Sequence, residues 1–218
     1  NSFFALRAGG PENDATSARV KGCITDAMPY TDVLVIKNAG PSPLSGGWSS
    51  QQTYVIAGRV SFELRDGADM PLDIGESNVA YPYRLQIYYI RDGATPTLSR
   101  KILAWDAVTE SMSIQTEDLV QGVENMRFRF GYDSNDDGEV DTLANLTDVT
   151  IADKWDVVTS LQVFLLLASD VIDPNYTNEK TYQLGDIAVS PEDSVRRILL
   201  HSNITLRNRR LAWRGGGQ

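Results

Sequence analysis

The sequence of 218 residues contains a single cysteine and a single histidine, two residue types on which many enzymes and metal sites depend. A single cysteine, Cys23, excludes an internal disulfide framework and a cysteine-based zinc site. A single histidine, His201, is the one candidate for histidine-dependent catalysis, and its position one residue off an apolar register favours an exposed imidazole. No apolar run approaches the ~20 residues that a transmembrane helix needs.

Motifs for catalysis are also missing. The chain has no nucleophile elbow, no glycine-rich phosphate loop and no HExxH zinc motif. Its net charge of −9 argues against a general nucleic-acid binder. The charge is uneven, because the segment from Arg196 to the end holds six arginines and no acid. These arginines are either solvated charge beside an acidic body or a docking strip for an acidic partner. We therefore expect neither an enzyme nor a nucleic-acid partner.

Alternation of apolar and polar residues dominates the chain and predicts β-strands. The alternating or strand-length segments are 32–37, 59–65, 83–105 (as a hairpin with a loop around Pro96), 127–132, 157–167 and 198–206. Apolar residues occupy both faces near the end of 157–167, so this strand should be covered on both sides. Residues 118–126 instead show helical spacing and predict a short helix, with Thr116 as its cap.

Together these patterns predict an α+β fold: a β-rich domain with mainly antiparallel sheets and few short helices. No composition change divides the chain, so we expect a single domain over residues 1–218. Residues 1–8 resemble the last turns of a helix, because Gly9, Gly10 and Pro11 follow them as stop signals. The glycine-rich end predicts a flexible tail at 211–218.

The most specific local pattern is an acidic loop, defined here as residues 133–141. Side-chain oxygens recur at relative positions 1, 3, 5 and 9, with glycine at 6, as at the front of a calcium loop. The predicted Ca²⁺ ligands are the side chains of Asp133, Asn135, Asp137 and Asp141 and the carbonyl of Glu139.

Position 12 of the calcium loop, however, is Ala144 rather than the bidentate glutamate of an EF-hand. A closing ligand would come from Asn145, Asp148, Asp153 or water. The alternative is a solvated acidic turn, because Asp, Asn and Gly are also common turn residues.

Several stretches resemble one family. Residues 118–133, DLVQGVENMRFRFGYD, resemble the LVxGVENxxxxYGxD segment of PilW, a minor pilin of type IV pili. Shorter stretches resemble PilW in the same order: 4–9, 22–23, 32–36, 89–93, 155–169 and 204–209.

This resemblance implies a β-rich pilin-like ectodomain whose N-terminal helix is truncated. It implies no enzymatic activity and a role in priming pilus assembly at or near the tip. Its partners would be other minor pilins and the pilus tip complex, with membrane contact only through the absent helix. It would be anchored in the inner membrane with a periplasmic ectodomain, and become extracellular in the pilus.

Two alternatives stay open. One is a GspJ-type pseudopilin of type II secretion, which shares the arrangement of alternating strands around a tryptophan. The other is a calcium-stabilised extracellular adhesion or carbohydrate-binding domain. An upstream apolar stretch with a prepilin processing site would favour a pilin, and a cleavable secretory signal would favour the adhesin.

Overall fold

A computed structural model describes residues 3–8, 23–59, 62–135, 137, 139–152 and 154–206. The fold is β-rich and every named strand pairing is antiparallel, which confirms the fold class expected from the sequence. The strands are β1 (Phe3–Arg7), β2 (Asp32–Ala39), β3 (Thr53–Ala57), β4 (Phe62–Asp66), β5 (Val79–Arg91), β6 (Thr97–Asp106), β7 (Ser111–Gln121), β8 (Val123–Tyr132), β9 (Thr142–Asn145), β10 (Val158–Ile172), β11 (Tyr182–Leu184), β12 (Ile187–Val189) and β13 (Val195–Thr205). The helical segments are η1 (Gly67–Asp69), α2 (Leu146–Ile151) and η2 (Lys154–Asp156).

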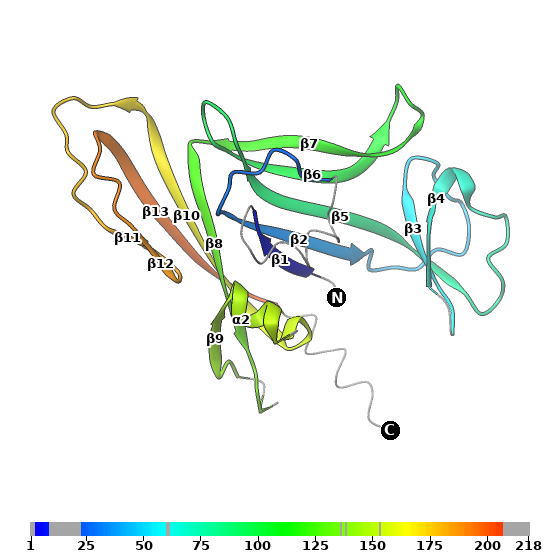
Figure 1. Ribbon diagram of the computed structural model, residues 1–218. Coiled ribbons are helices and arrows are strands. Elements are labelled where there is room, and N and C mark those ends of the chain that lie inside the picture. The colour runs from blue at the N-terminus through cyan, green and yellow to red at the C-terminus, as the bar shows by residue number, and fades with distance from the viewer. Residues whose placement is uncertain are drawn as a thin grey trace.

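The first sheet is organised around the long strand β5. One edge of β5 pairs with β2, which in turn pairs with β1. The other edge pairs with β3 near the start of β5 and with β6 near its end. Strand β4 extends the sheet beyond β3, and β7 extends it beyond β6 (Figure 1).

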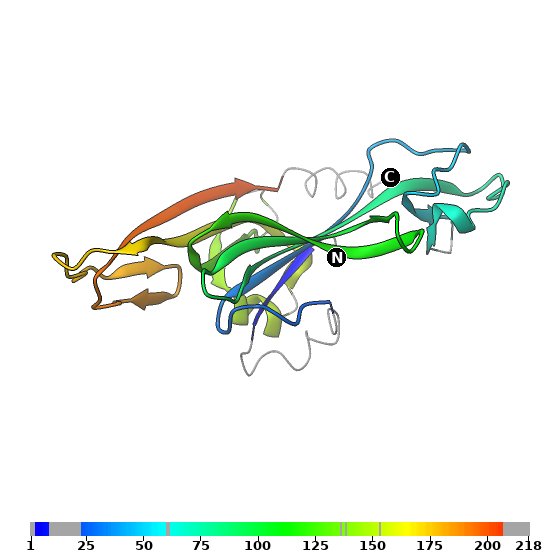
Figure 2. The ribbon, with the colours of Figure 1, turned by 90° about the horizontal axis from the view of Figure 1, so that it is seen from above.

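The second sheet has the order β13-β10-β8-β9, and a small β11–β12 hairpin lies beside it. Seen from above, the molecule is elongated, with β11–β12 near one end and β3–β4 at the other (Figure 2). Strand β8 packs against the first sheet, so that Phe128 and Phe130 are buried with Val35 and Tyr89. The indole of Trp155 contacts Phe130 edge-to-face at 5.1 Å between ring centroids, which closes this core near η2.

A buried carboxylate links three strands inside this core. Asp32 begins β2, and its Oδ1 lies 3.0 Å from Nε of Arg7 on β1 and 3.4 Å from Nη1 of Arg127 on β8. The backbone N–H of Phe128 donates to Asp32 Oδ2 at 3.0 Å. Burial raises the pKa of Asp32, while Arg127 and Arg7 oppose that shift. The two sheets are therefore joined by a polar contact as well as by apolar packing.

Residues 3–7 correct the helix expected at 1–8: they form strand β1. Phe4, Ala5 and Leu6 are buried and pair with residues 33–35 of β2, so the ladder satisfies their backbone groups. A short, continuous apolar run fits a buried strand as well as it fits a helix end. Asn1, Ser2 and residues 9–11 lie outside the described residues, as does the tail expected at 211–218.

The helix expected at 118–126 is also wrong. Strand β7 runs to Gln121, β8 begins at Val123, and Gly122 makes the turn between them with φ of 78°. The helix-like spacing arises because two strands meet at this turn, and Thr116 lies within β7 rather than at a helix cap. Leu119 and Val120 are exposed instead of forming a buried helical face.

The other strand expectations are confirmed. Residues 32–37 lie in β2, 83–105 form the β5–β6 hairpin around Pro96, and 127–132 lie in β8. Strand β10 is covered on both faces, since Leu161 belongs to the main core and Leu166 packs with the β11–β12 hairpin. Of the strand expected at 59–65, Val60 and Ser61 lie outside the described residues.

Candidate interaction surface

His201 and Cys23, the single histidine and the single cysteine of the sequence, do not form a reactive centre in the described part of the chain. His201 is exposed on β13, and its ring stacks on Phe164 of β10 at 4.9 Å between centroids. Cys23 is half-buried and packs against the main core.

The acidic loop connects β8 to β9 and is held by its own hydrogen bonds. Asn135 Nδ2 donates to Asp137 Oδ2 at 3.1 Å and to Asp141 Oδ1 at 3.4 Å. Both the backbone N–H and the hydroxyl of Ser134 donate to Asp141 Oδ2 at 2.8 Å. These donors lower the pKa of the Asp141 carboxyl. The loop therefore gathers several of the oxygens expected from the sequence, with an amide nitrogen between two carboxylates.

The side-chain oxygens of the proposed ligands also accept hydrogen bonds from the protein backbone. Backbone N–H groups of Asn135, Asp137 and Glu139 each donate to the side chain two residues earlier. Asp148, considered as a closing ligand, accepts from the N–H of Asn145 at 3.4 Å at the start of α2. Asp136, Gly138 and Asp153 lie outside the described residues.

Among the residues that the structure describes, no group of three or more His, Cys, Asp or Glu side chains could hold a metal ion. To bind calcium, Asn135 would have to turn its amide oxygen toward the ion. The calcium site thus stays a prediction.

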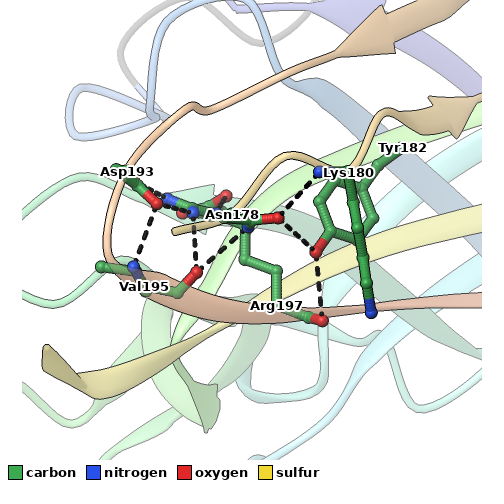
Figure 3. Close-up of polar contacts among 7 residues, drawn as sticks. Asn178, Lys180, Tyr182, Asp193, Val195 and Arg197 are labelled. Carbon is green, nitrogen blue, oxygen red and sulfur yellow. Dashed lines mark hydrogen bonds and ion pairs between the residues drawn. The ribbon is translucent and has the colours of Figure 1, made fainter. Parts of the chain in front are cut away.

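A polar cluster fixes the start of β13 (Figure 3). The Arg197 guanidinium contacts both carboxylate oxygens of Asp193, at 2.6 and 2.8 Å, and its Nε donates to Glu124 on β8. These partners raise the pKa of Arg197, and Arg197 lowers the pKa of Asp193. Asn178 Nδ2 donates to the Val195 carbonyl at 3.1 Å, so the long connection from β10 is tied to β13.

The Tyr182 hydroxyl completes this cluster, because it lies 3.3 Å from both Asn178 Oδ1 and the Arg197 carbonyl (Figure 3). On this face of the second sheet, Tyr182 and Leu184 of the hairpin cover Leu166. The cluster and the hairpin together hold the first half of β13 in place.

On the opposite face of the second sheet, side chains become more exposed from β8 through β10 to β13. Phe128 on β8 is buried, Leu165 on β10 is half-buried, and Leu200 on β13, directly opposite Leu165, is 45% exposed. Ile198 and Ile204 on β13 are exposed in the same way, at 56% and 45%. We call Ile198, Leu200 and Ile204 the β13 apolar strip. The sequence marked these residues as strand positions but gave no sign that the strand lies at a sheet edge.

A second apolar surface lies at the other end of the molecule, on β3, β4 and β5. Phe62 and Leu64 are 71% and 46% exposed, and Val79 is 40% exposed. Their cross-strand partners Ala57 and Val55 place them on one face. The other face of these strands is covered by a small core that contains Tyr54 and Trp48.

The comparison with protein families gives one match. The family model for PilW, type IV pilus-assembly protein W, matches residues 87–208, from the second half of β5 through β13. No curated protein and no solved structure matches the chain. Within the described residues, no helix has the length and apolar character needed to cross a bilayer.

Proposed function

Since the chain belongs to the PilW family of type IV pilus-assembly proteins, we propose that it acts as a non-enzymatic minor pilin within the pilus. The observation that carries this proposal is the family match, which covers residues 87–208 and includes the whole second sheet. An assembly role suits a protein with two exposed apolar sheet faces, because such faces commonly contact other proteins.

The finer proposal concerns place and partners. The chain would join other minor pilins in a complex that primes pilus growth and stays at or near the tip. It would be held in the inner membrane by an N-terminal helix, with its ectodomain in the periplasm, until the pilus carries it outside the cell. These statements follow from what the family resemblance implies for a minor pilin.

The test is deletion of the gene followed by complementation. Cells without the chain should show far fewer surface pili, and the full-length gene should restore them. Full-length protein with an affinity tag should co-purify with minor pilins encoded beside it. Normal piliation together with loss of type II secretion would instead support a GspJ-type pseudopilin.

The acidic loop favours one further candidate, a calcium-stabilised adhesion or carbohydrate-binding domain. Binding of the purified chain to a glycan array, in calcium but not in EGTA, would support this candidate. Binding that is indifferent to calcium and to Asp137→Ala would remove the observation that favours it.

A further inference from the structure

Strand β13 has an outer edge that is free over its second part, after the polar cluster at Val195 and Arg197. Within the described part of the chain, β13 pairs with β10 alone, so its outer edge from Ile198 onward presents backbone N–H and C=O groups. The eight residues from Ile198 to Thr205 include no Asp, Glu, Lys, Arg, Pro or Gly. Natural proteins usually protect exposed edge strands with charge, proline, bulges or short length.

Among the residues that the structure describes, the other outermost strands of the two large sheets are shorter or carry charge within the strand. Strands β1 and β4 have five residues each and β9 has four, so they offer short edges. Strands β7 and β13 both have eleven residues, but Glu117 and Asp118 lie within β7, whereas Arg196 and Arg197 lie at the start of β13 and leave eight residues without charge after them. Of these outermost strands, β13 therefore has the longest run of residues without charge.

The β13 apolar strip gives the free edge a hydrophobic face. Ile198, Leu200 and Ile204 lie opposite Leu167, Leu165 and Leu161 of β10. Those β10 residues belong to the main core or pack against it. A strand added beside β13 would continue this apolar layer and satisfy the free backbone groups at the same time, whereas a helix laid on the strip would leave the backbone edge unpaired.

We propose that the outer edge of β13 receives an extended strand from another polypeptide chain, which adds to the second sheet by β-augmentation. The strand would carry apolar side chains at alternate positions, facing the same side as the β13 apolar strip. That the donor is a pilus subunit rests on the proposed function, but the chemistry of the strand does not.

Charge disfavours a second copy of this chain as the occupant. Arg196 is 63% exposed at the start of β13, although Asp173 pairs with it. Arg207, Arg209 and Arg210 follow the strand in the sequence. Because arginines stand near both ends of β13 in the sequence, antiparallel pairing of two copies of this strand is disfavoured. The occupant therefore has acidic residues beside its apolar positions.

The test uses a synthetic probe with this chemistry. The probe is a fluorescein-labelled peptide of alternating valine and threonine with two glutamates at each end. We expect saturable binding by fluorescence anisotropy, and a preference of about tenfold over the same peptide ended by lysines. A control peptide carries N-methyl groups on two adjacent central residues, which blocks both of its edges, and it should not bind.

Matched variants of the chain locate the site. Leu200→Lys introduces a charge into the strip and should weaken binding about tenfold or more. Leu72→Lys makes the same change at a fully exposed loop residue and should leave binding unchanged. Amide hydrogen exchange read by NMR should slow at every second residue of β13 when the peptide binds.

Three results would overturn the proposal. One is no protection of β13 amides at millimolar peptide, and another is equal binding of the N-methylated peptide. The third is self-association of the chain that Leu200→Lys abolishes, since a second copy would then be the occupant. If the peptide does not bind but deletion of the gene still removes the pili, this site is rejected and the proposed function stands.

Discussion

Asp32 and Arg127 are 95 residues apart in the sequence, yet their side chains form a buried ion pair at 3.4 Å. The Asp32 side chain is fully buried and that of Arg127 is 6% exposed. Arg7 contacts the same Asp32 oxygen from β1. One carboxylate thus faces two guanidinium groups at the junction of the two sheets.

Removing that carboxylate should destabilise the fold strongly. Asp32→Ala leaves two arginines without their buried anion, and loss of one partner from such a pair costs about 3–5 kcal/mol. Urea unfolding followed by circular dichroism measures the change. The control is Arg65→Ala, which breaks an exposed pair with Glu63 and should cost at most about 1 kcal/mol. Equal effects of the two substitutions would contradict the role given to Asp32.

Tyr89 should make stability fall at alkaline pH. Burial, followed by the nearby Asp26 carboxylate, raises the pKa of Tyr89 to about 12. The folded state therefore keeps the phenol proton where the unfolded chain, near its ordinary value of 10.0, releases it. Stability should fall as pH rises from about 10 to 12. Tyr89→Phe should flatten this part of the profile and remove one late phenolate from the absorbance titration.

The ion pair between Asp193 and Arg197 should make stability fall at acidic pH. Arg197 lowers the pKa of Asp193 in the folded state, so this stabilisation is present above the ordinary carboxyl pKa and is lost as pH falls through the lowered value. Melting temperatures measured from pH 6 down to 2 should fall less for Asp193→Asn than for the wild type. Asp170→Asn, at an exposed β10 position, serves as the matched control and should follow the wild-type slope.

The turn at Gly122 should not accept a side chain. Its φ of 78° disfavours L-residues, and an added Cβ would lie 2.8 Å from the carbonyl oxygen of Ala168. Gly122→Ala should therefore destabilise the chain by at least about 1–2 kcal/mol in denaturant unfolding. At Gly93 an added Cβ meets nothing within 4 Å, so Gly93→Ala should be close to neutral.

The calcium prediction is tested by thermal unfolding in CaCl₂ and in EGTA. An incomplete loop implies a Kd of about 10⁻⁴–10⁻³ M, so the melting temperature should rise at millimolar calcium. Asp137→Ala should abolish that rise. A melting temperature that does not depend on calcium in the wild type would leave the solvated acidic turn as the correct interpretation.

Local patterns in the sequence predicted much of the fold because strand alternation is a local property. The two-sided burial of β10 followed from apolar residues at successive positions, including Phe164 and Leu165. Patterns of a few residues failed at 1–8 and 118–126, where a short apolar run fits either a strand or a helix.

Local sequence patterns could not predict the interaction surface, because its contacts join segments that are distant in the sequence. Glu124 and Arg197 meet across 73 residues. The exposure of Leu200 depends on which strand lies next to β13, and the sequence of β13 alone does not say. The sequence does show a strand-length run without charge from Ile198 to Thr205, but only the strand order of the sheet shows that this run lies at an edge.

The pairing of β1 with β2 has a mechanical consequence. A pull applied to Phe3 along the strand would load all five residue pairs of the β1–β2 ladder together, rather than opening them one after another. The buried contact of Arg7 with Asp32 lies at the far end of that ladder and carries the load into the core. Under tension along β1, the β1–β2 ladder would therefore resist separation by shear, which requires more force than peeling the strands apart pair by pair.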